Sequence, residues 1–176
     1  DKLPAEVEAT SRYVDLAVVK LDDASFFDTH PALPFAEGIP SVKDTVNVFG
    51  FPIGGEQLSI TEGIVSRVEY VSFVLGTSVL RIQVDAALNP GNSGGPAVVD
   101  GKIAGIVFGG MREADNIGYL IANEEVRRFL DDIRDGKYDG KPRIGGVAHP
   151  TGNPALREKL GLPEEGGGVI IRDPCS

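Results

Sequence analysis

The chain has 176 residues, of which 41% are hydrophobic, and it carries a formal charge of −9 from 17 basic and 26 acidic residues. This acidic excess argues against a nucleic-acid partner, because phosphate binding needs clustered Lys and Arg. The longest apolar runs, such as Ile103 to Phe108, are far too short to span a membrane. One cysteine, Cys175, excludes an internal disulfide, and one Cys with two His argues against a structural zinc site.

Strand patterns dominate the first two-thirds of the chain. Short apolar or alternating runs are separated by turns that contain Gly and Pro, which predicts an all-β barrel or sandwich. Gly63 is expected at a bulge or bend, and Asp100-Gly101 at a hairpin turn. The strands are expected near residues 14–21, 45–50, 59–71, 79–85, 96–99, 102–108 and 117–121.

One strand and one helix have clear periodic patterns. The strand expected at 79–85 alternates apolar residues with Arg81, Gln83 and Asp85. Apolar residues with helical spacing predict a helix over 124–135 that would close the barrel domain. Its first turn holds two glutamates, Asn123 is expected as its N-cap and Gly136 as its C-cap. The apolar positions are Val126, Phe129, Leu130 and Ile133.

The composition changes after this helix. A polar stretch with Gly and Pro indicates a linker, followed by a short helix from Pro154 to about Leu160 and a strand in "GGGVIIRDP". Some 35 residues are too few for a hydrophobic core of their own. We therefore expect one domain over residues 1–138, and a linker with the beginning of a second domain over residues 139–176.

The stretch "DAALNPGNSGGP", residues 85–96, surrounds one serine with Gly, Asn and Pro. It fits the G-x-S-x-G pattern of the α/β-hydrolase nucleophile elbow, but that elbow needs a helix after Ser93, and a β-hairpin is expected there. A plain turn with an incidental serine leaves the density of Gly unexplained. In a third interpretation, the turn points the N–H groups of Gly91 and Ser93 into one small cavity, as in an oxyanion hole.

Several segments together resemble one family. The serine motif, "DLAVVKL" (15–21), "GFPIGGEQLSITEGIVSRVE" (50–69) and "NIGYLIAN" (116–123) are similar to the Deg/HtrA family of chymotrypsin-like serine proteases, in the form of its plant and algal organellar members. "RIGGVAHPTGNPALREKLGLPEEGGGVIIRDP" (143–174) resembles the start of that family's PDZ domain. The resemblance implies a two-barrel chymotrypsin-like fold with a C-terminal helix, followed by a truncated PDZ domain.

The resemblance also implies roles for individual residues. Ser93 would be the nucleophile and Asp15 the carboxylate that orients the histidine, whereas Asp85 has no triad role and is expected to be structural. The oxyanion hole would comprise Gly91, Asn92 and Ser93, and the specificity pocket Leu88, Gly118, Tyr119, Leu120 and Ile121. This specificity pocket would favour a small or medium apolar side chain of the substrate.

The histidine departs from the family pattern, whose order along the chain is His, Asp, Ser. No histidine precedes Asp15, and we expect His30 and His149 to be ordinary surface residues. The catalytic histidine would lie upstream, so that the 176 residues are part of a longer protein and have no activity alone. The alternative is a proteolytically inactive relative that acts as a chaperone or binding scaffold.

The implied function is that of an ATP-independent serine endopeptidase in protein quality control. Its substrates would be unfolded or damaged proteins, and it would use no metal or other cofactor. The family implies a homotrimer or higher homo-oligomer, with no nucleic-acid partner and no membrane span. The expected location is a chloroplast or another organelle, with the bacterial cell envelope as the alternative.

Overall fold

The computed structural model describes residues 3–53, 57–72, 78–110, 117–141 and 147–172. The chain divides into two compact units, residues 1–140 and 141–176. Cys175 and part of the expected linker, residues 142–146, lie outside the described residues. Within the described part, no helix is long and apolar enough to cross a membrane.

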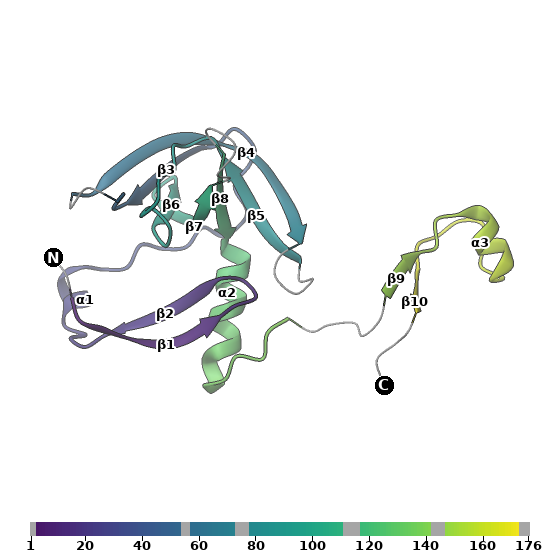
Figure 1. Cartoon of the computed structure of the whole chain (residues 1–176), viewed down its shortest axis with the longest axis horizontal. Coiled ribbons are helices and arrows are strands. Elements are labelled where there is room, and N and C mark those ends of the chain that lie inside the picture. Colours follow the sequence, from purple (N-terminus) through teal and green to yellow (C-terminus); the bar gives the residue numbers. More distant parts are fainter. Residues whose placement is uncertain (1–2, 54–56, 73–77, 111–116, 142–146, 173–176) are drawn as a thin grey trace. The chain divides into compact units, whose positions relative to one another are not determined.

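The first unit is built around a closed antiparallel barrel with the strand order β3-β4-β5-β8-β7-β6 (Figure 1). β3 pairs with β4, β4 with β5, β6 with β7 and β7 with β8, whereas β5 pairs with β8 and not with β6. β3 closes the barrel against β6 through Asn47 with Val98 and Val48 with Ala97. The strands are β3 (Thr45–Gly50), β4 (Ser59–Ser72), β5 (Ser78–Val84), β6 (Pro96–Val99), β7 (Lys102–Gly110) and β8 (Gly118–Ala122). The expected all-β barrel is therefore confirmed.

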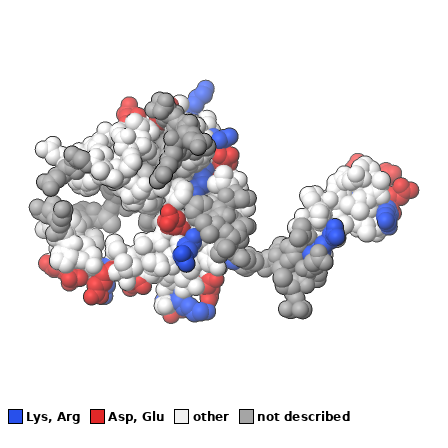
Figure 2. All heavy atoms as spheres, viewed as in Figure 1, with Lys and Arg blue, Asp and Glu red and all other residues white. Residues whose placement is uncertain are grey.

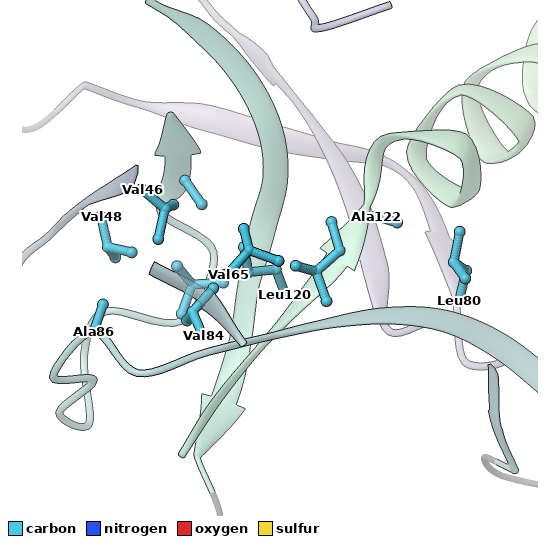
Figure 3. Packing of buried hydrophobic residues seen from close by; sticks show 11 residues of the cluster. Val46, Val48, Val65, Leu80, Val84, Ala86, Leu120 and Ala122 are labelled. Atoms are coloured by element: carbon cyan, nitrogen blue, oxygen red, sulfur yellow. The ribbon is translucent and has the colours of Figure 1, made fainter. Parts of the chain in front are cut away.

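The barrel is filled by β-branched and other aliphatic side chains that alternate with outward-facing residues. Figure 3 shows Val46, Val65 and Leu120, from three different strands, converging in this core. Ile82 is completely buried, whereas Ile60 on the neighbouring strand is 57% exposed. The core cluster comprises Val46, Val48, Val65, Leu80, Ile82, Val84, Ala86, Ala97, Val107, Leu120 and Ala122.

Two further strands, β1 (Ala5–Ser11) and β2 (Leu16–Leu21), form a separate antiparallel pair beside the barrel (Figure 1). The strand expected over 14–21 corresponds to β2. β1 was not predicted, although Ala5, Val7 and Ala9 alternate with polar residues, and most of its side chains are exposed. The short helix α1 (Phe26–Thr29) follows.

The helix predicted over 124–135 is α2 (Asn123–Asp132), continued by a single 3₁₀ turn (Ile133–Asp135). Gly136 ends it in the left-handed region with φ 87°, as expected for a C-cap. The N-cap expected at Asn123 is wrong. The Asn123 side chain is buried and donates hydrogen bonds to the carbonyls of Ile103 and Ala36, because the barrel offers these acceptors next to the helix start.

Two turn predictions had different outcomes. Asp100 (φ 49°) and Gly101 (φ 74°) both have positive φ angles and connect β6 to β7, as predicted for the hairpin. The bulge predicted at Gly63 is wrong, because Gly63 pairs regularly with Val46 and the register shifts between Val65 and Arg67. Gly63 is instead required by space, since a Cβ there would lie 2.4 Å from the Ala86 nitrogen.

The second unit contains β9 (Val147–Pro150), α3 (Pro154–Lys159) and β10 (Val169–Arg172), with β9 and β10 antiparallel. Asn153 caps α3 by accepting a hydrogen bond from the Leu156 N–H. The buried Arg157 donates to the carbonyls of Thr151, Pro163, Glu165 and Gly166, and so fixes the loop between α3 and β10. The expected short helix and following strand are both present.

The packing of the barrel predicts different costs for two isoleucine truncations. Ile82→Ala would leave a cavity in the core and should lower the free energy of unfolding by about 2–5 kcal/mol. Ile60→Ala removes an exposed side chain on the neighbouring strand and should change it by less than about 1 kcal/mol. Urea denaturation of both variants measures the difference, and equal losses would contradict the described core.

Candidate functional site

Ser93 lies in the loop between β5 and β6, and this loop is fixed against β7 by backbone hydrogen bonds. The Gly94 N–H donates to the Val107 carbonyl at 2.8 Å, and the Val107 N–H donates to the Gly95 carbonyl at 2.9 Å. On the other side of the loop, the Ile53 N–H donates to the Pro90 carbonyl at 2.8 Å. The serine is thus held exposed on a loop whose backbone is fixed on both flanks.

Close packing of backbone against backbone explains the glycines of this loop. Gly91 has a φ of +102°, and a Cβ on it would lie 2.4 Å from the Phe51 carbonyl oxygen. At Gly95 a Cβ would lie 2.0 Å from the Phe49 carbonyl oxygen. No helix follows Ser93, because β6 begins at Pro96, and the nucleophile-elbow interpretation is therefore wrong.

The amides around Ser93 have different partners. The Asn92 N–H donates to the Asn89 carbonyl at 3.0 Å and so closes the turn, and the Asn92 side chain is buried. Among the described residues, neither the Gly91 N–H nor the Ser93 N–H has a backbone acceptor. These two amides flank the buried Asn92.

The Ser93 hydroxyl donates to the Phe108 carbonyl at 3.3 Å. Phe108 lies on β7 where the register with β8 shifts between Val107 and Gly109. This bulge turns the Phe108 carbonyl toward the serine loop rather than into the ladder. The hydroxyl is therefore directed along β7, toward the strand segment that ends at Gly110.

Asp15 lies in the turn between β1 and β2, is exposed and has a φ of 59°. The left-handed region is uncommon for a residue other than Gly, although Asp tolerates it better than most. The preceding Val14 is buried and its N–H donates to the Ser11 hydroxyl at 3.4 Å. The turn is also fixed through Tyr13, whose ring lies 6.4 Å from that of Tyr138 after α2.

A buried arginine lies beside Phe108, the residue whose carbonyl accepts the Ser93 hydroxyl. Arg81 on β5 is 1% exposed, and its guanidinium carbon lies 4.1 Å from the centroid of the Phe108 ring. Burial lowers the pKa of the Arg81 guanidinium below its usual value, and the attraction of Asp15 and Glu125 opposes this shift. Sequence reasoning missed Arg81 because polar alternation on a strand normally indicates exposure.

The residues expected to form a specificity pocket occupy different positions around β8. Leu88 is half buried and packs directly on Gly118, where a Cβ would lie 2.3 Å from Leu88 Cδ1. Leu120 belongs to the barrel core, Ile121 is buried, and Tyr119 is half exposed. The structure thus brings Leu88 and Gly118 together and places Leu120 behind them in the core.

Beside the serine loop lies an open pocket of about 270 Å³ with almost entirely apolar walls. Phe49, Phe51, Leu58 and Pro96 contribute to it, and the first two are the residues whose carbonyls pack on Gly95 and Gly91. The same segment that supports the serine loop therefore also presents an apolar hollow to solvent.

The remaining candidates from the sequence are Asp85, His30 and His149. Asp85 has the structural role expected of it, because its Oδ1 accepts the Ile64 N–H at 2.6 Å and ties β4 to the end of β5. His30 is exposed, its ring stacks on Phe26 with centroids 4.2 Å apart, and its Nδ1 lies 2.9 Å from Thr29 Oγ1. His149 is exposed on β9 in the second unit.

The described residues show no metal-binding group of three or more His, Cys, Asp or Glu side chains. On the face shown in Figure 2, basic side chains lie in small groups among acidic ones rather than in one continuous patch.

Comparisons with known proteins identify the family of the chain. The trypsin-like peptidase domain model matches residues 1–106. The chain is 44% identical over 165 residues to a serine protease DegP homolog of Plasmodium falciparum, covering 93% of this chain and 19% of that protein. It is 40% identical over 174 residues to the mitochondrial protease Do-like 4 of Arabidopsis thaliana, covering 98% of this chain and 33% of that protein.

A solved structure shows the same likeness. The HtrA-type protease AlgW, determined with a decapeptide, superposes with a TM-score of 0.74 at 28% identity, covering 96% of this chain and 51% of that one. The chain is also similar to the chloroplastic protease Do-like 2 of Arabidopsis thaliana. The two are 42% identical over 168 residues, which cover 92% of this chain and 28% of that protein. The chain belongs to the trypsin-like peptidases and, among them, to the Deg/HtrA (Do-like) serine proteases.

Proposed function

We propose that the protein containing this chain is an ATP-independent serine endopeptidase that cuts unfolded or damaged proteins. The observation that carries this proposal is the exposed Ser93 on a loop fixed from both sides, with the Gly91 and Ser93 amides free of backbone acceptors among the described residues. Acyl transfer needs a hydroxyl as the nucleophile and, beside it, two amide N–H groups that can donate to the oxyanion.

In the proposed mechanism, Ser93 attacks the carbonyl carbon of a peptide bond. A histidine upstream of this chain accepts the hydroxyl proton, and Asp15 holds the imidazole in the required tautomer and stabilises the imidazolium. The Gly91 and Ser93 amides bind the oxyanion. The imidazolium then gives its proton to the leaving amine, and water releases the acyl group by the same steps.

The surroundings of the loop support an unfolded chain as the substrate. Unfolded proteins expose apolar side chains, and the apolar pocket at Phe49, Phe51 and Pro96 lies directly beside the serine loop. Leu88 packed on Gly118 would limit the specificity pocket to small or medium apolar side chains. The chemistry assigned to these residues involves no ATP, metal or other cofactor.

The wider protein follows the family in this proposal. Residues 1–138 are the protease domain, residues 139–176 are a linker and the start of a PDZ domain, and the assembly is a homotrimer or larger. The names of relatives place them in mitochondria and chloroplasts, which supports an organellar location over the bacterial cell envelope. A role in protein quality control follows from the proposed substrates.

A second candidate is a protease-like chaperone or binding scaffold that holds misfolded chains without cutting them. It is favoured by one observation, that the ring of His30 stacks on Phe26 and its Nδ1 lies 2.9 Å from Thr29 Oγ1 at helix α1. The apolar pocket would serve such a scaffold equally well. The two candidates differ in whether Ser93 is needed for the effect on the bound chain.

The endopeptidase proposal predicts that catalysis depends on Ser93 and Asp15. The full-length protein should cleave casein, Ser93→Ala should abolish cleavage, and Asp15→Asn should lower kcat by about 10⁴-fold because the imidazole loses its orienting carboxylate. Gel and fluorescence assays of casein fragments measure this. The 176-residue chain alone should show no cleavage. Replacement of the upstream histidine by alanine in the full-length protein is the control. The scaffold would be favoured if the protein prevents aggregation of a misfolded chain, with or without Ser93→Ala, and never cleaves it.

The oxyanion hole predicts a contrast between two left-handed glycines. Gly91→Ala should lower kcat by about 10²-fold or more, because the new Cβ meets the Phe51 carbonyl and displaces the Gly91 amide. Gly136→Ala carries a similar positive φ (87°) with open space around it, far along the chain at the end of α2. It should cost stability but leave kcat within about two-fold, and a similar loss of kcat in both variants would refute the assignment.

The pocket assignment predicts a change in substrate preference. Leu88→Ala would remove the side chain that packs on Gly118 and should shift cleavage toward larger apolar residues before the scissile bond, by about ten-fold in relative kcat/KM. Mass spectrometry of casein fragments measures the preference. Leu160→Ala, at an exposed leucine of the second unit, is the control, and an unchanged preference in Leu88→Ala would contradict the pocket.

A further inference from the structure

Arg81 is unusual because it is a cation with almost no exposure. Its neighbours on β5, Leu80 and Ile82, belong to the barrel core, so alternation places Arg81 on the opposite face of the sheet. That face is covered, and Arg81 is 1% exposed. Burying a guanidinium costs several kcal/mol unless charges and π-systems around it compensate. The groups that surround Arg81 therefore indicate what it holds in place.

One of these groups is the ring of Phe108. The guanidinium carbon lies 4.1 Å from the ring centroid, within the range of a cation–π contact that strengthens when water is excluded. Arg81 pairs with Ile121 of β8, and β8 pairs in turn with β7, so the arginine side chain extends across β8 to reach Phe108. The carbonyl of the same Phe108 accepts the Ser93 hydroxyl.

Two carboxylates of the described residues also attract the guanidinium, and they come from different elements. Asp15 belongs to the turn between β1 and β2, and Glu125 to the first turn of α2. Glu125 is buried and has a second role, because its Oε1 accepts the Leu80 N–H at 2.9 Å. The charges of Asp15 and Glu125 thus act on the cation that stacks on Phe108, the residue that accepts the Ser93 hydroxyl.

We propose that Arg81 is a positioning residue of the active site, which orients Asp15 through charge and the Phe108 carbonyl through the stacked ring. This rests on the proposed endopeptidase function. Arg81 touches neither the serine nor the substrate in this role. Its effect is on the relative placement of Asp15 and Ser93, between which the imidazole must fit. A purely structural arginine would instead serve only to neutralise Glu125.

Kinetics of the full-length protein test the proposal. Arg81→Met keeps the length and apolar stem but removes the charge and the planar group, and it should lower kcat for casein cleavage by about ten-fold or more with KM within about two-fold. Arg81→Lys keeps the charge without the planar stack and should recover part of the loss. Arg67→Met is the matched control, an exposed arginine of β4 that pairs with Glu69 and Gln83.

Glu125→Gln separates positioning from stability. The amide oxygen can still accept the Leu80 N–H, while the carboxylate charge beside Arg81 is lost. We expect a lower Tm but a kcat within about two-fold of the native protein at a temperature where both are folded. A fall in kcat below about three-fold in Arg81→Met, or an equal fall in Glu125→Gln, would overturn the proposal.

A second measurement distinguishes failure of the proposal from failure of the proposed function. If the native full-length protein shows no Ser93-dependent cleavage, the proposed endopeptidase function is refuted, and kinetic measurements cannot test the positioning role of Arg81. The Arg81 Nε–H resonance in the NMR spectrum then decides: Asp15→Asn should shift it, and Asp28→Asn on the exposed helix α1 should not. An unchanged resonance in Asp15→Asn would overturn the proposal by itself.

Discussion

The position of Ser93 depends on two backbone hydrogen bonds, from the Gly94 N–H to the Val107 carbonyl and from the Val107 N–H to the Gly95 carbonyl. They make the serine loop an extension of β7, and β7 is fixed because the barrel is closed and Val107 belongs to its core. On its other flank the loop meets the segment after β3, where the Gly95 and Gly91 backbones approach the carbonyls of Phe49 and Phe51. The density of glycine in the motif follows, because a side chain at either position would separate the loop from its support.

The same packing connects the stability of the barrel to the chemistry of the loop. Core side chains such as Ile82 on β5 and Leu120 on β8 support the strand pairing that holds β7 in register, and the bulge at Phe108 is part of that register. The bulge frees the Phe108 carbonyl for the serine hydroxyl. Interiors are close-packed and transmit small displacements. Changes in the barrel core are therefore expected to alter activity before they unfold the protein.

The barrel strands, the hairpin at Asp100-Gly101 and the C-cap at Gly136 could be predicted because each depends on local periodicity or backbone conformation. The serine loop could be recognised for the same reason. The failures have a different origin: the role of Gly63 depends on the Ala86 backbone across the sheet, and that of Asn123 on the carbonyls of Ile103 and Ala36. The burial of Arg81 likewise depends on elements distant in sequence. Sequence patterns report which residues are apolar, but they do not report which polar faces become covered.

In this chain of net charge −9, acidic residues from other elements attract the buried Arg81 on the covered face of β5. An acidic residue in the first turn of a helix is ordinarily explained by the helix dipole, and Glu125 satisfies that pattern. Glu125 is nevertheless buried, and its Oε1 accepts the Leu80 N–H. Its main interactions are therefore with strand β5 and with the Arg81 cation, rather than with the helix dipole. Asp15 and Glu125 both attract the buried cation, and the attraction of Asp15 is the stronger of the two. In the role proposed for Arg81, this attraction relates the exposed Asp15, whose φ is 59°, to strand β5, so that the charge of the aspartate acts on the turn as well as on the buried cation.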